Sequence, residues 1–237
     1  MSATDRSVSW PQPGQIHVWY CRQDSATEPA ADTLDAAERE QAGRFRNRHD
    51  ARRHMATHGA LRRILAAYLG LDPAAVPITR SAAGKPRLGL SGAEPGLTFN
   101  LSHSADLAAV AVAAGAEIGV DIEEKRPLAD LDGVARLVFT EAECAALDSL
   151  PQSRRLDAFY ECWTRKEALL KAMGSGLLRD PREVGLGFGE GGKMEFRDAD
   201  SSLWSIAPLA PPEGMGGAVA IQGRLLGVLQ FDGAPGK

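Results

Sequence analysis

The sequence predicts an α+β protein assembled from two similar halves, each a small sheet packed with helices. Its 237 residues, 44% apolar and 24% charged, are typical of a soluble globular protein with one large domain or two small ones. A helix carrying Arg52 and Arg53 precedes two strand-like runs, and a later helix carrying "RKE" precedes two more. This parallel indicates duplication, although many α+β chains show the same helix-then-strand order. The predicted halves are residues 1–115 and 116–237.

Composition and charge exclude several classes of protein. The net charge of −4 is mild and predicts neither a nucleic-acid nor a membrane partner. The three cysteines are scattered and none sits in a C-x-x-C pair, which argues against a zinc knuckle or a disulfide framework and fits a reducing compartment. The N-terminus lacks the apolar core of a signal peptide, and Gly115, Glu117 and Gly119 interrupt the longest apolar stretch. We expect a cytoplasmic protein with no membrane span.

The first half opens with a strand and two helices. β-branched and aromatic residues in "IHVWY" predict the strand, and helix caps with a closing Gly and Pro bound the helices. In chain order these elements are a strand at residues 16–20, a helix at 33–45 capped by Thr33, a helix from about 49 to 70, and a turn at "GKP", residues 84–86.

The rest of the chain alternates between strands and helices. Two β-rich runs flank the polar tip "NLSHSAD", and "EIGVDIE" adds a third, so we expect all three to pair in one sheet. The segment "LDGVARLVFTEAECAAL" contains a short helix, followed by a capping box, Thr140 with Glu143, that opens another helix. The strongest helix contains "FYECWTRKEALLKAM" and ends at Gly174 and Gly176. The remainder, including "GLGF", "KMEFRD", "LWSIAPL" and "GAVAIQG", predicts a β-rich tail.

Three acids follow directly on a buried strand in "IGVDIEE". Because side chains alternate along a strand, Asp121 and Glu123 point to the same side and Ile122 to the other. Two carboxylates on one face suit Mg²⁺, which takes a few protein oxygens together with water and substrate phosphate. The alternative is a strand end that meets solvent, because a single D-x-E pair is a weak motif.

The strongest helix places charge beside its apolar side. At 100° per residue Lys166 falls inside the apolar arc of this helix, so its ammonium needs a buried partner. Glu167 and Lys171 lie four residues apart at the edge of the arc. The positions of these three residues therefore indicate a functional site. The alternatives are that Lys166 extends its ammonium to solvent and that Glu167 and Lys171 form an ordinary surface pair.

Eight arginines between residues 39 and 63 concentrate positive charge in an acidic protein. Such a segment attracts phosphates, but a solvated helix face and a nucleic-acid surface are competing interpretations. The second of these lacks interleaved aromatic residues and a recognised nucleic-acid motif. His54 and His58 have the spacing of helix metal ligands without the glutamate of H-E-x-x-H, so we expect them to be structural. Ser102 and His103 face opposite ways on a strand, which favours donors to an anionic ligand over a catalytic triad.

Five motifs occur together in one order: "GKP" (84–86), "FNLSHS" (99–104), "GVDIE" (119–123), "FTEAE" (139–143) and "WTRKEALLKAMGSGL" (163–177). In this order the chain resembles the Sfp-type 4'-phosphopantetheinyl transferases. The resemblance implies a pseudo-dimer of two α/β halves with the active site in the cleft between them. It also implies transfer of the 4'-phosphopantetheine arm of coenzyme A to a serine of an apo carrier protein, with release of 3',5'-ADP.

The resemblance gives each candidate residue a role. It implies that Asp121, Glu123 and Glu167 ligate Mg²⁺, and that Glu167, or a metal-bound water it orients, removes the serine proton. Lys166 and Lys171 would neutralise the pyrophosphate of coenzyme A, and Glu143 would be a supporting acid or an alternative base. The implied nucleotide and phosphate contacts are Arg53, Lys85, Ser102 and His103.

Two positions depart from the family pattern. Glu38 and Gln41 stand where the best-known member has lysines for the 3'-phosphate, so Arg39, Arg44 or Arg48 would have to substitute. The length fits the broad-specificity type that serves polyketide and nonribosomal peptide synthesis, and we expect a monomer that binds coenzyme A and acyl or peptidyl carrier proteins, but no nucleic acid or membrane. The alternative from another class is a non-catalytic module that binds coenzyme A or a nucleotide phosphate.

Overall fold

The computed structural model describes residues 8–23, 31–81, 84–89, 96–174, 179–189 and 194–235. Within these ranges the strands form two four-stranded sheets and a separate hairpin. The first sheet has the order β10-β1-β5-β4, with β1 at Gln15–Arg22, β4 at Leu97–Ser104, β5 at Leu107–Ala114 and β10 at Gly227–Asp232. The second has the order β6-β9-β8-β7, with β6 at Ile118–Glu124, β7 at Met194–Arg197, β8 at Leu203–Pro208 and β9 at Met215–Gln222. The hairpin pairs β2 (Ile78–Arg80) with β3 (Pro86–Leu88).

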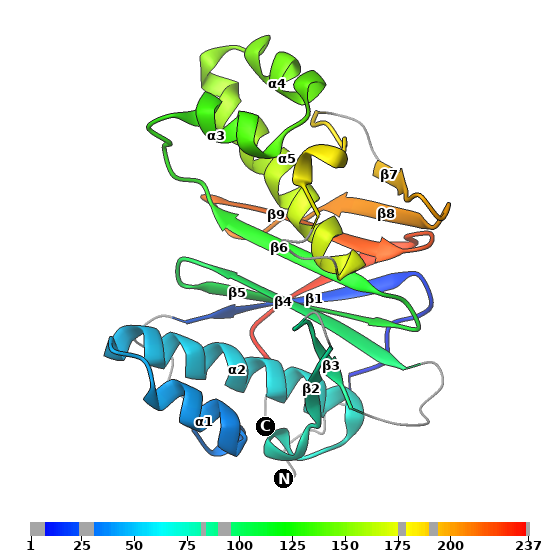
Figure 1. The fold of residues 1–237 in the computed structure, drawn as a ribbon. Coiled ribbons are helices and arrows are strands. Elements are labelled where there is room, and N and C mark those ends of the chain that lie inside the picture. Colours follow the sequence, from blue (N-terminus) through cyan, green and yellow to red (C-terminus); the bar gives the residue numbers. More distant parts are fainter. Residues whose placement is uncertain are drawn as a thin grey trace.

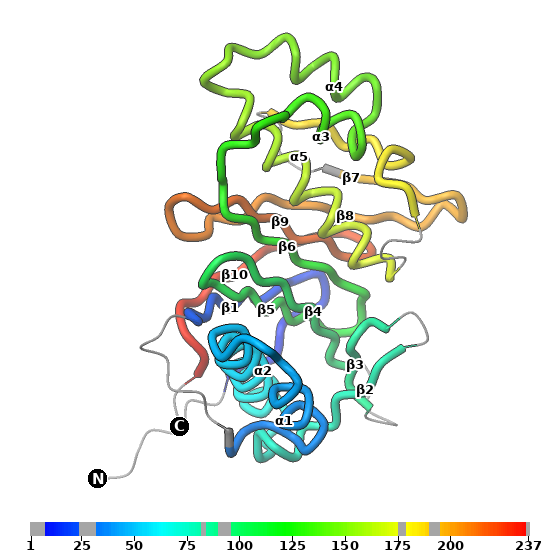
Figure 2. Tube along the Cα trace, turned by 60° about the vertical axis from the view of Figure 1, so that its left-hand side comes forward, coloured from blue at the N-terminus to red at the C-terminus, as the bar shows by residue number. Residues whose placement is uncertain are grey.

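The helices cover the outer faces of the two stacked sheets. The helix α2 (Arg48–Leu69) lies on the first sheet and α5 (Gln152–Met173) on the second, as Figure 1 and the turned view in Figure 2 show. The shorter helices are α1 (Ala36–Gly43), α3 (Leu131–Val138) and α4 (Glu141–Asp148). The α+β class and the two-halved architecture are therefore as the sequence predicts.

Strict alternation of side chains builds three apolar layers. On β1, Ile16 and Val18 pack between the two sheets, while Trp19 faces α2. On β5 the same alternation sends odd-numbered residues between the sheets and even-numbered ones toward α2. Apolar residues of α5 pack on the outer face of the second sheet. Both faces of each central strand are thus buried, which explains the continuous apolar run in β5.

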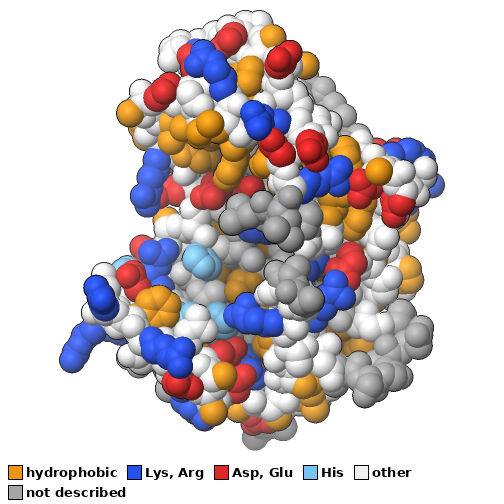
Figure 3. Space-filling view, viewed as in Figure 1, with side chains coloured by type: hydrophobic (Ala, Val, Ile, Leu, Met, Phe, Trp, Pro, Cys, Tyr) orange, Lys and Arg blue, Asp and Glu red, His pale blue; other side chains and the backbone are white. Residues whose placement is uncertain are grey.

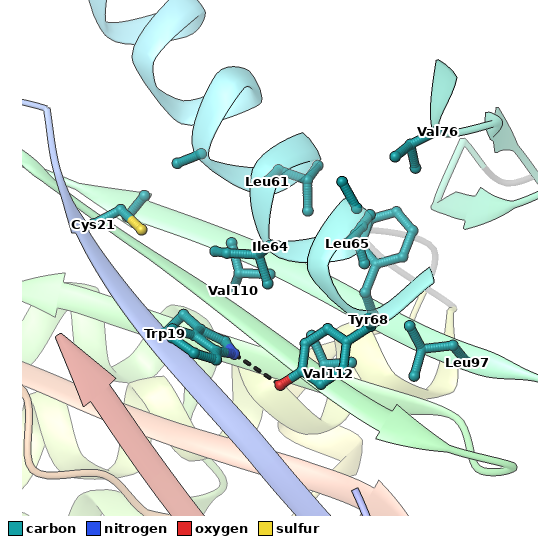
Figure 4. Close-up of a cluster of buried hydrophobic side chains, with 14 residues drawn as sticks. Trp19, Cys21, Leu61, Ile64, Leu65, Tyr68, Val76, Leu97, Val110 and Val112 are labelled. Atoms are coloured by element: carbon teal, nitrogen blue, oxygen red, sulfur yellow. Dashed lines mark hydrogen bonds between the residues drawn. The ribbon is translucent and has the colours of Figure 1, made fainter. Parts of the chain in front are cut away.

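The core under α2 contains a polar contact that ties the helix to the sheet. Tyr68 near the end of α2 accepts a hydrogen bond from Trp19 Nε1 at 3.0 Å through its hydroxyl, as Figure 4 shows. The same hydroxyl lies 2.7 Å from Nδ1 of His17. Because a buried hydroxyl without partners is costly, these contacts fix where α2 ends on the sheet.

Of the described strands of the second half, β10 pairs in the sheet of the first half, while the other four form the second sheet. The strand β6 follows β5 in the chain but pairs with β9, and β10 follows β9 but pairs in parallel with β1. The expectation that "EIGVDIE" joins the two preceding strands in one sheet is therefore wrong. The physical reason is that Val120 and its apolar neighbours are needed between the sheets, while Gly119 and Asp121 face α5.

The edges of the two sheets meet where β4 and β6 lie side by side. The backbone N–H groups of β6 along this edge are bound by side chains of β4. Val120 N donates to Asn100 Oδ1 at 2.9 Å, Ile122 N to Ser102 Oγ at 3.4 Å, and Glu124 N to Ser104 Oγ at 3.1 Å. We call this row of contacts the seam. It satisfies edge donors that would otherwise be buried without partners.

A buried arginine joins α1, α2 and the segment that follows. Arg62 is fully buried and donates to the carboxylates of Asp35 and Glu38. It also donates to three backbone oxygens, those of residues 73, 74 and 76. Arg62 therefore holds the fold together, and this part of the arginine-rich segment is not available to a ligand.

Several predicted boundaries are confirmed and some are wrong. Gly70 and Gly174 end α2 and α5 in the left-handed conformation, at φ 66° and 71°, whereas Gly176 lies outside the described residues. Asp35 rather than Thr33 caps α1, because its side chain accepts from Glu38 N. The stretch "GLGF" is not a strand, and β10 was not predicted. In the described part of the chain, no helix is long and apolar enough to cross a membrane.

Gly119 allows α5 to approach β6 closely. A Cβ built at this position would lie 2.0 Å from the carbonyl oxygen of Ala168 and 2.4 Å from the nitrogen of Ala172. Both atoms are helix backbone, so neither can rotate away. A side chain at residue 119 would push α5 off the strand that carries Asp121.

We predict that Gly119→Ala lowers the free energy of unfolding by on the order of 1–3 kcal/mol, because overpacking against backbone forces the helix to shift. Urea unfolding measures the loss. Gly227→Ala is the matched control, since it is also a strand glycine but has no atom within 4 Å of the added Cβ. Equal stabilities of the two variants would show that the close approach is not tight.

Candidate active site at the seam

The two acids of β6 face α5 as the alternation predicts. Ile118, Val120 and Ile122 are buried between the sheets, so Asp121 and Glu123 point to the opposite side. On that side α5 presents Glu167 and Lys171, one turn apart on the same helix face. The first part of the predicted constellation is therefore assembled from a strand and a helix of the second half.

Asp121 is the most buried member of the site. It is 3% exposed, and its Oδ1 accepts from Lys171 Nζ at 2.7 Å and from Ser102 Oγ at 3.0 Å. Its other oxygen, Oδ2, is buried and has no partner among the described residues. Burial raises the pKa of Asp121 to about 6, with Glu123 adding to the rise and Lys171 opposing it. The lone pairs of Oδ2 are therefore left to bind a further ligand.

Glu123 and Glu167 complete an acidic cluster around one lysine. Glu123 Oε2 accepts from Ser104 Oγ at 2.7 Å. Glu167 makes no hydrogen bond with another described residue, and burial raises its pKa, with the negative charge of Glu123 adding to the rise and Lys171 opposing it. Lys171, which is itself 29% exposed, pairs with Asp121, and its charge also acts on Glu167.

The cluster has the donors that a hard divalent cation requires. An orphaned oxygen on Asp121, an unbonded carboxylate on Glu167 and a partly bonded one on Glu123 are all oxygen ligands, and a cation would relieve their mutual repulsion. In the described ranges no three His, Cys, Asp or Glu side chains are already close enough together to enclose an ion. The residues thus fit Mg²⁺ by chemistry and burial, and they would have to draw together around it.

The structure does not bring Lys166 and Glu143 into this cluster. Lys166 is fully buried and pairs with Glu143 at 2.7 Å, and its ammonium also donates to the carbonyls of Pro181 and Val184 at 2.9 and 2.6 Å. Glu143 accepts from the backbone of Thr140, Leu186 and Gly187, so both its oxygens are occupied. In this structure the two side chains lie in a buried pair apart from the acidic cluster, and the roles in binding pyrophosphate and in proton transfer stay predictions. The pair anchors the segment after α5.

Lys85 also has a different setting from the one predicted. Its ammonium donates to Glu117 Oε2 at 2.8 Å and to the carbonyls of Ile118 and Ala172, both at 3.1 Å. The side chain is only 9% exposed, and these three contacts use all three N–H donors of its ammonium. The ammonium lies at the C-terminal end of α5, where the helix dipole favours a cation. Lys85 joins β6 to α5 and leaves no free hydrogen for a phosphate in this arrangement.

Arg53 and His103 line a pocket on the α2 side of β4. The pocket has a volume of about 320 Å³, and its walls include Gln23, His54 and Thr57. In Figure 3 histidine side chains gather in a hollow between the two halves, with Lys and Arg side chains beside it. Burial lowers the pKa of His103, and the charges of Arg53 and Lys171 lower it further. The pocket and the acidic cluster are therefore neighbours across β4.

The polar tip between the strands divides into two functions. His103 points to the pocket, whereas Asn100, Ser102 and Ser104 point to β6 and form the seam. Ser102 also accepts from Lys171 Nζ at 3.0 Å, so it touches the acidic cluster as well. Of the two residues expected to donate to an anionic ligand, only His103 faces the pocket, because alternation sends Ser102 to the other side of the strand.

A second pocket lies beside Lys171. It has a volume of about 240 Å³, is lined by Lys85, Asn100 and Lys171, and shares Leu101 with the first pocket. Sequence reasoning missed Gln23, Phe45 and Thr57 in the first pocket and took His54 and His58 as structural. The sequence did contain a signal for the two histidines, because His54 and His58 have the same i, i+4 spacing on α2 as Arg53 and Thr57, which also line the pocket. Gln23 gave no signal, since it follows the predicted strand.

Comparison with known proteins covers both halves. Residues 117–220 match the model of the 4'-phosphopantetheinyl transferase superfamily, and residues 19–115 match the model of the 4'-phosphopantetheinyl transferase N-terminal region. The 4'-phosphopantetheinyl transferase HetI of a Nostoc species is 38% identical over 213 residues, which cover 88% of each chain. The two matched regions meet between β5 and β6, where the halves were predicted to divide.

Two further relatives match over shorter stretches. The 4'-phosphopantetheinyl transferase of Bacillus subtilis is 33% identical over 144 residues, 61% of this chain and 62% of the relative. The L-aminoadipate-semialdehyde dehydrogenase-phosphopantetheinyl transferase of Xenopus laevis is 32% identical over 170 residues, 67% of this chain and 55% of the relative.

We predict that Lys166→Met lowers the free energy of unfolding by about 3–5 kcal/mol, because it leaves the Glu143 carboxylate buried without its cation. Adding Glu143→Gln should recover part of the loss. Urea unfolding measures both effects. Lys125→Met is the control, since Lys125 pairs with the exposed Asp157, and its loss should stay below about 1 kcal/mol. Weakened coenzyme A binding without loss of stability would restore the predicted role of Lys166.

Proposed function

The chain belongs to the 4'-phosphopantetheinyl transferase superfamily, and we propose that its acidic cluster and neighbouring pocket transfer the 4'-phosphopantetheine arm of coenzyme A to a serine of apo carrier proteins. The observation that carries the proposal is the proximity of the carboxylates of Asp121, Glu123 and Glu167 to one another, with Lys171 paired to Asp121, beside a pocket with Arg53 and His103. A module that only binds coenzyme A would not need three partly buried carboxylates next to an anionic substrate.

Asp121, Glu123 and Glu167 would hold Mg²⁺, because their oxygens are the ligands this ion prefers and Asp121 Oδ2 has no other described partner. When bound, the ion supplies Lewis-acid polarisation of the phosphoryl group and offsets the charge of the diphosphate. Asp121 and Glu167 have different roles in this proposal. Asp121 is held rigidly by Ser102 and Lys171, whereas Glu167 is free of hydrogen bonds to described residues.

Glu167 is the residue best suited to take the serine proton. Its raised pKa makes it a stronger base than an ordinary glutamate, and no described donor occupies its carboxylate. As the serine oxygen attacks the phosphorus that carries the pantetheine arm, the bond from that phosphorus to the ADP oxygen breaks. The proton passes to Glu167 and 3',5'-ADP leaves.

Lys171 and Arg53 supply the positive charge for the phosphates. Lys171 Nζ lies at the cluster beside Asp121 and is partly exposed, so it can turn to the diphosphate when the acids gain a cation. Arg53 lies in the neighbouring pocket, where its partner Asp106 is 3.7 Å away and itself half exposed. His103 faces the same pocket. These residues suit the adenosine-phosphate end of coenzyme A, with 3',5'-ADP as a stabilised leaving group.

The finer assignments follow from the family. We propose that the natural acceptors are carrier proteins of polyketide or nonribosomal peptide synthesis, since the two-halved length suits the broad-specificity type. The monomeric state and the cytoplasmic location stay parts of this proposal.

Incubation of the protein with coenzyme A, Mg²⁺ and an apo carrier protein should add the mass of one phosphopantetheine group to the carrier serine, as intact-protein mass spectrometry measures. A serine-to-alanine carrier is the control and should remain unmodified. Absence of the adduct across a panel of acyl and peptidyl carriers, despite measurable coenzyme A binding, would favour the non-catalytic module.

Glu167→Gln should lower the turnover number by on the order of 10²-fold or more, because the amide cannot accept the serine proton and is a weaker metal ligand. The rate of carrier modification at saturating coenzyme A measures this effect. Glu124→Gln is the matched control, since Glu124 lies on the other face of β6 and pairs with the exposed Arg126. Turnover of Glu167→Gln within a factor of about three of the control would remove the proposed base.

A further inference from the structure

Two serines of β4 are matched with the two acids of β6 across the seam. Ser102 Oγ donates to Asp121 Oδ1 at 3.0 Å, and Ser104 Oγ donates to Glu123 Oε2 at 2.7 Å. The serines are two residues apart on their strand, as the acids are on theirs, so each pair shares one face of its strand. Both proposed metal ligands of β6, in the second half, are therefore contacted by a side chain from the first half.

These serines do more than satisfy the backbone of β6. Asn100 is the third member of the seam, and its Oδ1 accepts from Val120 N at 2.9 Å while its side chain donates to no carboxylate among the described residues. Ser104 accepts from Glu124 N at 3.1 Å in the same way. An acceptor is thus enough to pair the edge of β6, and the bond from Ser104 to Glu123 is additional to that task.

The hydroxyl of Ser104 is fixed in direction by its two partners. A serine hydroxyl carries a single proton and two acceptor lone pairs. Because a backbone N–H only donates, Ser104 Oγ uses a lone pair for Glu124 N, and its proton points to Glu123 Oε2. Rotation of the hydroxyl proton would break the bond to Glu123, and rotation of the side chain would break both bonds. Ser104 is therefore a donor that the backbone of β6 holds towards the carboxylate.

Among the described residues, Ser104 is the one that donates a hydrogen bond to Glu123. Asp121, by comparison, accepts from two side chains. Glu167 receives no hydrogen bond from a described residue, although its side chain is the same as that of Glu123. A glutamate has three rotatable bonds, so a carboxylate without a partner samples several positions. The bond from Ser104 thus distinguishes an oriented carboxylate on β6 from an unconstrained one on α5.

We propose that Ser104 is a positioning residue of the metal site, whose hydroxyl holds Glu123 in the orientation in which it ligates Mg²⁺. The inference rests on the proposed function, because that function assigns the ion to Asp121, Glu123 and Glu167. It adds a side chain of the first half to a site whose ligands all come from the second. Hydrogen-bond partners of ligating carboxylates set the affinity for the metal, because they orient the ligand before the ion arrives.

Ser104→Ala removes the donor and should weaken Mn²⁺ binding by about 10- to 100-fold, because the ion itself then has to order the Glu123 carboxylate. Mn²⁺ replaces Mg²⁺ as the probe, since electron paramagnetic resonance counts the free ion directly. The titration uses the full chain with saturating coenzyme A and without carrier protein. Ser104→Thr keeps the hydroxyl and should bind Mn²⁺ within about threefold of the unmodified protein.

Thr98→Val is the matched control on the same side of β4. The hydroxyl of Thr98 donates to the carbonyls of Ala113 and Ala116 at 3.3 and 2.6 Å, so valine removes a partly buried hydroxyl without touching a carboxylate. This variant should lose stability in urea, as Ser104→Ala does, yet keep the Mn²⁺ affinity of the unmodified protein. Equal losses of Mn²⁺ affinity in the two variants would show that any weakening of β4 disturbs the ion, and would refute a specific role for Ser104.

A double-mutant cycle tests whether Ser104 acts through Glu123. In the Glu123→Ala background, Ser104→Ala should change the Mn²⁺ affinity by less than about twofold, because the carboxylate that it orients is gone. During carrier modification, the Mg²⁺ concentration that gives half the maximal rate should rise for Ser104→Ala, while the rate at saturating Mg²⁺ stays within about threefold of the unmodified protein. A full loss of Mn²⁺ affinity in both backgrounds would contradict the inference.

Unchanged Mn²⁺ affinity in Ser104→Ala would overturn the inference directly. Should that variant fail to fold, a crystal structure of the unmodified protein with coenzyme A and Mn²⁺ decides. Glu123 should contact the ion while it still accepts from Ser104, and a Glu123 that has left Ser104 to reach the ion would also overturn the inference. Mn²⁺ binding at the cluster without carrier modification would contradict the proposed transfer but not the role of Ser104. No Mn²⁺ binding to the unmodified protein would contradict both.

Discussion

The whole site depends on how the backbone donors at the edge of β6 are satisfied where this strand lies beside β4. Its backbone N–H groups face β4 without a backbone ladder, and Asn100, Ser102 and Ser104 accept from them. Buried donors at a sheet edge have to be paired, so the spacing of these three side chains sets the register between the two halves. The register in turn places Ser102 and Ser104 at the carboxylates of β6.

The hydrogen bonds of the seam allow the charged side chain of Asp121 to be buried in the site beside Lys171. Ser102 binds the backbone of β6, Asp121 and Lys171 at once, so one hydroxyl links both sheets and α5. Around it, Asp121 and Glu167 are raised in pKa mainly by burial, and Lys171 is the cation that opposes this. The free protein thus holds excess negative charge in a restricted space. Such a site gains most from a divalent cation and a substrate that arrives with it.

The sequence predicted local features well and long-range partners poorly. The alternation of Asp121 and Glu123, the ends of α2 and α5, and the capping box of Thr140 with Glu143 are local rules, and the structure confirms them. Lys166 lies on the buried side of its helix as its position in the apolar arc indicates. Its partner comes from a different helix, and no pattern within α5 could identify Glu143.

Strand exchange was the main feature that sequence patterns could not supply. The strand β6 starts a new sheet with β9 and does not pair with β5, and β10 joins the sheet of the first half, which depends on packing between sheets and not on local propensity. The direction of the side chains on β4 was predictable from alternation, but the identity of their partners depended on β6 lying alongside. The histidine pocket likewise requires α2 and β4 to meet, which the i, i+4 spacing on α2 alone does not state.

The most direct measurement of the central claim is an anomalous-diffraction crystal structure of the protein with coenzyme A and Mn²⁺ in place of Mg²⁺. It should locate the ion among the carboxylates of Asp121, Glu123 and Glu167, with the Lys171 ammonium turned from Asp121 to the diphosphate. An ion bound elsewhere, or a diphosphate remote from the seam while Lys171 stays paired with Asp121, would contradict the assignment.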